Sequence, residues 1–185
     1  MIESIKFVPK KVKGDIKPWI RFGSTREEYD LWSPEVCGIC CLKMVGDTFN
    51  KTNKMSLYSL TMQCLDKGGY RILADNRIEG VFHHPLLALG EELGLQGEVR
   101  GNLDHGSVIK ALGEEKLVIL SIDLKKVRPE FNGGHLILIY DYSSSLNSFF
   151  AHDPSYLLSR QGKGTRIDSE YLEVISNHKG IVLWP

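Results

Sequence analysis

Long hydrophobic segments are missing from this chain, and so is an excess of charge of either sign. The longest purely apolar run, Leu136–Tyr140, has the length of a strand and is far below the roughly 20 residues that a membrane-spanning helix needs. The 23 Lys and Arg residues balance 23 Asp and Glu residues, whereas a nucleic-acid-binding protein normally carries a basic excess or a basic face. We therefore expect neither a membrane span nor a nucleic-acid partner.

Cysteine is also scarce, with four residues in a chain of 185: Cys37, Cys40, Cys41 and Cys64. They are too few and too clustered for a disulfide framework. The N-terminal segment has lysines but no continuous apolar stretch, so no secretory signal is visible and a reducing cytoplasm is the expected compartment. The thiols are thus left for metal binding, redox chemistry, nucleophilic catalysis or packing.

Two of these roles have little support in the sequence. Cys37-Gly-Ile-Cys40 is a CxxC motif, but no second CxxC and no suitably spaced His pair completes a zinc site, so we expect no metal. A redox CxxC needs a buried strand directly before it, and residues 24–30 are polar. A glycine-rich phosphate loop is also missing, and no cofactor is expected.

What is present is the composition of an ordinary globular protein, 42% hydrophobic and 25% charged. We expect one domain over residues 1–185: an N-terminal arm (1–30) with one short strand (5–8), a helical part (31–95) and a sheet part (105–185). Apolar residues recur at helical spacing in segments 37–45, 57–65, 84–93 and 107–112. Short β-branched runs at 118–122, 136–140, 149–151 and 181–184 predict strands. Helices followed by strands indicate an α+β protein with a mostly antiparallel sheet.

The first predicted helix carries the most informative residue, Cys37. Ser33 is a good N-cap and Pro34 suits the first helical position, which would place Cys37 in the first turn, where the helix dipole favours a thiolate. A nucleophilic thiol also needs a base and an orienting group, and His135 and Asp153 are the best pair. In a hairpin centred near Ser144 these two lie opposite each other at the open end, and a one-residue shift of register would separate them.

Three short motifs, taken in order and spacing, resemble those of papain-like cysteine peptidases: Cys37-Gly38, Gly134-His135 and Asp153-Pro154. More narrowly, the chain resembles the family that processes bacteriocin leader peptides after a double glycine, together with its stand-alone relatives. The similarity covers roughly residues 31–156 and includes a partial match at residues 116–120 to the strand that precedes the family's histidine.

This resemblance implies an α+β papain-like fold, with helices packed on a mostly antiparallel sheet. It assigns Cys37 as nucleophile, His135 as base and Asp153 as the group that orients the base. The implied activity is thiol-dependent acyl transfer, most simply peptide hydrolysis. The implied partner is a peptide or acyl (thio)ester substrate, with a precursor peptide as one candidate.

One position departs from the family pattern. The glutamine whose amide helps to form the oxyanion hole is replaced by Leu31, and loss of one such donor typically lowers the rate on the order of a hundredfold. Tyr29, Trp32 or Ser33 is a possible substitute donor. The alternatives are an acyltransferase or cyclase with the same three residues, an inactive papain-like binding module, and a CxxC oxidoreductase.

Overall fold

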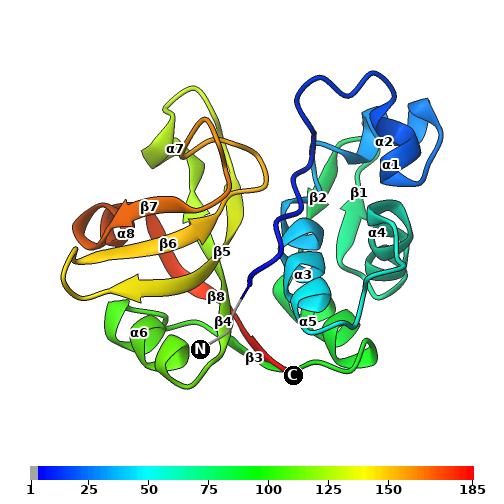
Figure 1. The fold of residues 1–185 in the computed structure, drawn as a ribbon. Coiled ribbons are helices and arrows are strands. Elements are labelled where there is room, and N and C mark those ends of the chain that lie inside the picture. The colour runs from blue at the N-terminus through cyan, green and yellow to red at the C-terminus, as the bar shows by residue number, and fades with distance from the viewer. Residues whose placement is uncertain (1–3) are drawn as a thin grey trace.

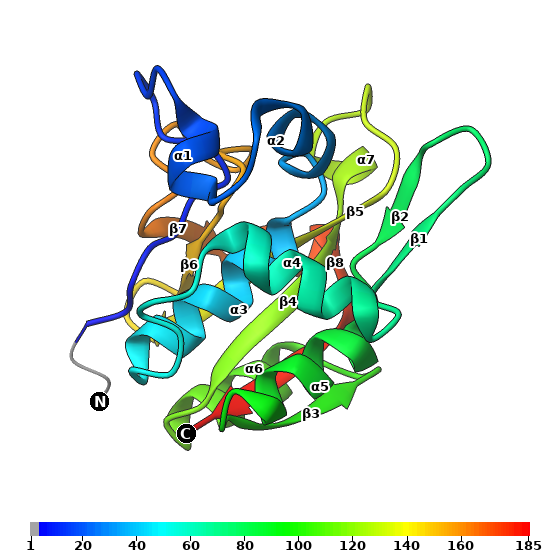
Figure 2. The ribbon, with the colours of Figure 1, turned by 90° about the vertical axis from the view of Figure 1, so that its right-hand side faces the viewer.

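The computed structural model describes residues 4–185, which form a mainly helical half and a sheet half with the N-terminal segment between them (Figure 1). The helical half comprises α1 (Pro18–Phe22), α2 (Arg26–Trp32), α3 (Cys37–Thr48), α4 (Leu57–Asp66), α5 (His83–Glu92) and the hairpin strands β1 (Tyr70–Ile72) and β2 (Ile78–Gly80). This hairpin projects from the edge of the molecule (Figure 2). The remaining elements are β3 (Gln96–Arg100), α6 (His105–Gly113), β4 (Leu117–Asp123), α7 (Leu124–Val127), β5 (Gly134–Ser143), β6 (Ser148–His152), β7 (Thr165–Asp168), α8 (Ser169–Ile175) and β8 (Ser176–Trp184).

The larger sheet has the strand order β3-β8-β4-β5-β6-β7, and every neighbouring pair in it is antiparallel. The predicted α+β class with a mostly antiparallel sheet is confirmed. Strand β4 is buried on both faces, because Leu117 and Ile119 pack in the core of the helical half while Val118 and Leu120 pack in a second core with α6 and α8. This explains why the strand reads as a continuous apolar run instead of an alternating one.

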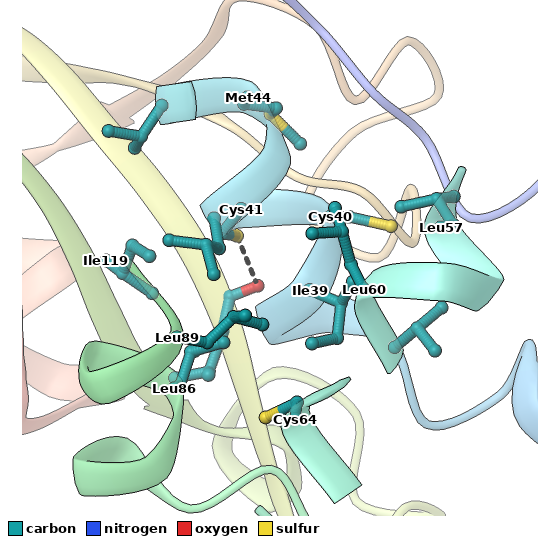
Figure 3. Close-up of a cluster of buried hydrophobic side chains, with 14 of the residues drawn as sticks. Ile39, Cys40, Cys41, Met44, Leu57, Leu60, Cys64, Leu86, Leu89 and Ile119 are labelled. Atoms are coloured by element: carbon teal, nitrogen blue, oxygen red, sulfur yellow. Dashed lines mark hydrogen bonds between the residues drawn. The ribbon is translucent and has the colours of Figure 1, made fainter. Parts of the chain in front are cut away.

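Helix α3 lies at the centre of the first core (Figure 3). Its Ile39, Cys40, Cys41 and Met44 side chains are completely buried, and Leu60 of α4 and the α5 leucines Leu86 and Leu89 surround them. Burial of each large apolar side chain contributes about 1.5–3 kcal/mol. The packing therefore fixes the position of α3 firmly against β5.

The sequence prediction was wrong at the N-terminal side of α3. Residues 5–8, which the structure describes, form no strand, and α1 and α2 occupy part of the expected irregular arm. Ser33 ends α2 and does not cap α3, whose N-cap is Val36. The signal for α2 was present, since Thr25 and Glu28 form a capping box in which each side chain accepts a hydrogen bond from the other's backbone N–H.

Several short elements were missed for a different reason. Strands β1, β2, β3 and β7 are three to five residues long and carry polar residues on an exposed or half-exposed face. They have no long apolar run, and their strand conformation depends on pairing with neighbours that are distant in sequence. Helix α3 also continues through Gly46 to Thr48, past its predicted end.

Candidate active site

Cys37 is the first residue of α3. The first helical hydrogen bond runs from the Cys40 N–H to the Val36 carbonyl at 2.9 Å, so the N–H groups of the first turn have no partner within the helix. Cys37 is partly exposed, whereas Cys40, Cys41 and Cys64 are buried. The predicted place of Cys37 in the first turn holds even though the predicted cap was wrong. Of the four thiols, this one combines access with the positive end of a helix dipole.

Leu136 of β5 ties the start of α3 to the sheet. Its carbonyl oxygen accepts a hydrogen bond from Cys41 Sγ at 3.5 Å, drawn as the dashed line from Cys41 in Figure 3, and its backbone also lowers the pKa of the Cys37 thiol. A Cβ atom on Gly38 would lie 2.8 Å from Leu136 Cδ1 and 2.2 Å from Val81 Cγ1. The glycine after the cysteine therefore permits α3 to approach β5 closely, and this brings Cys37 next to His135.

His135, the residue before Leu136, connects Cys37 with Asp153. Its Nε2 lies 2.8 Å from Asp153 Oδ1, and the ring is also hydrogen-bonded to the Cys37 sulfur. Because an imidazole has two nitrogens and Asp153 occupies Nε2, Nδ1 is the nitrogen left for Cys37. The histidine is only 3% exposed and the aspartate is completely buried. The structure thus brings together the three residues singled out in the sequence.

Asp153 is held by more than His135. Its Oδ1 also accepts from the backbone N–H of Ser155 at 2.9 Å, and its Oδ2 accepts from those of Leu157 and Leu158 at 2.6 and 2.8 Å. Burial by itself would raise the pKa of Asp153, but the hydrogen bond and charge of His135 and the backbone donors lower it below its ordinary value. Asp153 is therefore a fixed carboxylate beside the imidazole.

The predicted hairpin register, however, was wrong. Leu138 pairs with His152, two residues away from the predicted register, and a bulge lies between Ile139 and Asp141. A shift of two residues keeps side chains on the same face of the sheet, because the side-chain period of a strand is two. Asp153 follows the end of β6, where its three backbone donors set its position. Asp153 therefore still contacts His135, although the register differs from the predicted one.

Charge at the site is arranged as an ion pair. Burial by itself would raise the pKa of the Cys37 thiol, but the hydrogen bond and positive charge of His135, followed by the charge of Lys10, lower it to about 7. Burial by itself would lower the pKa of His135, but hydrogen bonds to Asp153 and Cys37 raise it to about 9. Between these two values the cysteine is a thiolate and the histidine an imidazolium.

Two cavities open onto this pair. One, of about 400 Å³, is lined by Lys10, Pro34 and Asn132 in addition to Cys37 and His135. The second, of about 220 Å³, is lined by Cys37, His135, Gly80, Val81, Phe82, His83, Ser121, Gly134, Leu136 and Lys179. Both cavities thus include Cys37 and His135 in their lining. Lys10, His83 and Lys179 were not identified from the sequence, because they come from segments with no motif.

Leu31 and its neighbours do not face these cavities. Leu31 is 47% exposed and lines a separate hollow beside β2. Tyr29, Trp32 and Ser33, the possible substitute donors, are 4%, 4% and 2% exposed, and none of these three described residues lines either cavity at Cys37. The expectation that one of them replaces the missing donor has no support in the structure.

His105, His152 and His178 line neither cavity at Cys37. His152 packs against the rings of Phe7 and Tyr140, while His105 and His178 pair with Glu173. Within residues 4–185, no three His, Cys, Asp or Glu side chains are grouped as metal ligands would be. Across the same residues, no helix has both the length and the apolar character to cross a bilayer.

Comparison with known proteins shows the fold. No protein-family model matches the chain, and no curated protein matches it. A C39-like peptidase from Bacillus anthracis matches at 12% identity with a TM-score of 0.61, over 98% of this chain and 95% of that one. The peptidase domain of Streptococcus ComA, a bifunctional ABC transporter involved in a quorum-sensing pathway, matches at 14% identity and 0.58, over 98% and 99%. A double-glycine-motif protease from an AMS/PCAT transporter, solved with a leader peptide, matches at 13% and 0.53, over 80% and 84%.

These matches extend over most of both chains. The chain therefore has the papain-like fold of C39 peptidase domains. The likeness to this type that the sequence motifs indicated is confirmed at the level of the fold.

Proposed function

We propose that this protein is a cysteine peptidase in which Cys37 is the nucleophile, His135 the general acid and base, and Asp153 the group that orients the imidazole. The observation that carries the proposal is that His135 contacts Asp153 through Nε2 at 2.8 Å and lies beside the Cys37 thiol at the same cavities. A cysteine nucleophile requires a base and an orienting partner in this arrangement.

The reaction follows from the protonation states. The Cys37 thiolate attacks a substrate carbonyl carbon, and the electrons of the carbonyl double bond move to its oxygen. The free N–H groups of the first turn of α3 lie where they can donate to this oxyanion. The oxyanion then collapses, the carbon–nitrogen bond breaks, and the His135 imidazolium protonates the leaving amine. Water activated by His135 hydrolyses the resulting thioester and regenerates the thiolate.

A peptide is the favoured substrate class. One structural neighbour was solved with a leader peptide and acts at a double-glycine motif. In this chain, Gly80 and Gly134 line both cavities at Cys37, where they add no side-chain bulk beside the sulfur. If an amine or thiol takes the place of water, the acyl group of the thioester is transferred to it, and the enzyme acts as an acyltransferase or cyclase.

The redox alternative is disfavoured by the surroundings of the CxxC motif. The element before α3 is the helix α2 followed by a turn, where a thioredoxin-type motif would follow a buried strand. Burial raises the pKa of Cys40 to about 12, so its thiolate is scarce at neutral pH. Cys40 is suited to packing in the core.

Incubation with fluorogenic peptide amides that carry Gly-Gly before the reporter tests the proposal, with Gly-Ala and Ala-Gly peptides as controls. We expect reporter release and an acyl-enzyme on Cys37 visible by intact-mass spectrometry, both lost in Cys37→Ala. Addition of hydroxylamine or a free amine separates hydrolysis from transfer by the mass of the product. Reporter release that persists unchanged in Cys37→Ala would refute the assignment.

A further inference from the structure

The oxyanion site beside Cys37 lacks the side-chain donor that an acyl-transferring thiol enzyme normally places there. Leu31 has no polar side-chain atom, and Tyr29, Trp32 and Ser33 are buried away from both cavities. Backbone N–H groups at the start of α3 supply one part of such a site. A side-chain donor would have to come from another segment of the chain.

Lys10, on the N-terminal segment, is a side-chain donor beside Cys37. Its side chain lines the cavity that contains Cys37 and His135, and its ammonium group donates a hydrogen bond to the Pro34 carbonyl oxygen. Pro34 belongs to the turn that leads directly into α3. The ammonium is therefore held next to the turn that leads into α3, at the cavity that Cys37 also lines. An ammonium has three N–H donors, so two remain after the bond to Pro34.

Both halves of the molecule hold the segment around Lys10. Toward the sheet half, the Lys10 N–H donates to the Pro154 carbonyl at 2.9 Å, and the Phe7 ring packs edge-on against His152 with centroids 5.2 Å apart. Toward the helical half, the Lys6 N–H donates to Thr48 Oγ1 at 3.1 Å. Figure 1 shows this segment running between the halves. The lysine is thus fixed before substrate arrives, as preorganised electrostatic stabilisation requires.

We propose that Lys10 is the second oxyanion donor of this active site, in place of the amide that Leu31 does not provide. This inference rests on the proposed function. When the thiolate attacks and the carbonyl electrons move to oxygen, a Lys10 N–H and the backbone N–H of Cys37 donate hydrogen bonds to that oxygen. No proton is transferred by Lys10, and the bonds weaken when the carbonyl re-forms and the amine leaves.

The electrostatics agree with this placement. The charge of Lys10 helps to lower the pKa of Cys37, after the larger effects of His135. Lys10 is therefore close enough to the sulfur for its charge to act on the reacting atoms. In the oxyanion the negative charge has moved from sulfur to the carbonyl oxygen, and the ammonium stabilises that second location as well.

Two reactions of the same thiol separate this role from a structural one. Acylation by p-nitrophenyl acetate or by the Gly-Gly amide passes through an oxyanion, whereas alkylation by iodoacetamide displaces iodide without forming one. We expect Lys10→Met to slow acylation on the order of a hundredfold, mainly in kcat, and to change the alkylation rate above pH ~9 by less than about threefold. Lys10→Arg, which keeps the charge and donors, should recover most of the acylation rate, and Lys10→Gln an intermediate share.

Variants of neighbouring residues test whether Lys10, and not another side chain at the cavity, is the oxyanion donor. Lys11→Met removes the same charge from the neighbouring residue, whose carbonyl accepts from Tyr156, and should leave both reactions unchanged. Asn132→Ala and Ser155→Ala remove the other side-chain donors that line the cavity, and each should reduce acylation far less than Lys10→Met. Acylation by Lys10→Met within threefold of wild type, or an equal loss in acylation and alkylation, would overturn the proposal.

Two further outcomes distinguish a folding defect of Lys10→Met from a failure of the proposed function. If Lys10→Met does not fold, the order of Lys10→Arg above Lys10→Gln in acylation supports the proposal, and equal rates contradict it. If Cys37→Ala retains wild-type acylation, the proposed function itself fails, whatever the Lys10 variants do.

Discussion

His135 Nε2 and Asp153 Oδ1 are 2.8 Å apart although the two residues are not partners in the strand ladder. Asp153 lies beyond β6, and the backbone N–H groups of Ser155, Leu157 and Leu158 hold its carboxylate. The loop after the strand therefore sets the position of the aspartate, while β5 sets that of the histidine. This division lets the contact persist although the hairpin register differs by two residues from the predicted one.

The first prediction concerns the thiol of Cys37. Its rate of alkylation by iodoacetamide should rise with a midpoint near pH 7, because its pKa is lowered to about 7. His135→Ala removes the main groups that lower the pKa of Cys37, while burial of the thiol still raises it. The midpoint should therefore move to the ordinary value of 9.0 or above. Mass spectrometry of the labelled peptide measures the rate. Cys64→Ser serves as a control that leaves the midpoint unchanged, and an equal midpoint with and without His135 would contradict the ion pair.

Peptidase activity should follow a bell-shaped pH profile. It should rise through about pH 7 as Cys37 ionises and fall through about pH 9 as His135 loses its proton. Asp153→Asn removes a charge that helps to raise the pKa of His135, so the falling limb should move to lower pH while part of the activity remains. Profiles of kcat/KM for both proteins test this, and a falling limb that does not move would argue against the role of Asp153.

Asp153 should also make stability depend on pH. Its pKa is lowered on folding from the ordinary 3.8, so its contribution is complete above that value and is lost as the pH falls through the lower folded value. Asp153→Asn should destabilise the protein by about 2 kcal/mol near neutral pH, because an amide group would face backbone donors. Urea unfolding at several pH values should show the difference shrinking below pH ~4. A difference independent of pH would contradict this account.

Gly38 should tolerate no side chain. A Cβ there would lie 2.2 Å from Val81 Cγ1, so Gly38→Ala should push α3 away from its neighbours, destabilise the protein by about 1–3 kcal/mol and slow alkylation of Cys37. Gly113→Ala is the matched control, since nothing lies within 4 Å of its Cβ and alanine favours the helix. Thermal unfolding and alkylation rates measure both effects. Normal reactivity in a stable Gly38→Ala protein would show that the close approach is not required.

The buried thiols should act in packing alone. Cys40→Ala and Cys41→Ala should each lower the free energy of unfolding by about 1 kcal/mol and retain peptidase activity, since both side chains are completely buried. Cys41→Ala should be the more costly of the two, because it also removes the hydrogen bond to the Leu136 carbonyl. Urea unfolding and kcat/KM give the two readouts. Loss of activity in folded Cys40→Ala equal to that in Cys37→Ala would revive the redox alternative.

Much of the central part of the fold could be predicted from local sequence. The helical spacing of Cys37, Cys40, Cys41 and Met44 and the apolar run at 136–140 correspond to α3 and β5, the two elements that meet at the site. Such signals are strong because the side chains are buried, and burial leaves a periodic or continuous apolar pattern. The choice of His135 and Asp153 likewise depended on residue types and spacing alone.

Tertiary structure decided what local patterns do not encode. The hairpin register depends on the bulge in β5, and the position of Asp153 depends on backbone donors that any residue type supplies. The polar segment around Lys10 has no periodicity, and its course between the halves depends on contacts with residues far away in sequence, such as Thr48 and Pro154. By itself, the sequence determined which groups are the candidates for the chemistry, because reactive side chains are visible in it. Only the folded chain decided which charges and N–H groups surround them, since those neighbours are brought together by packing.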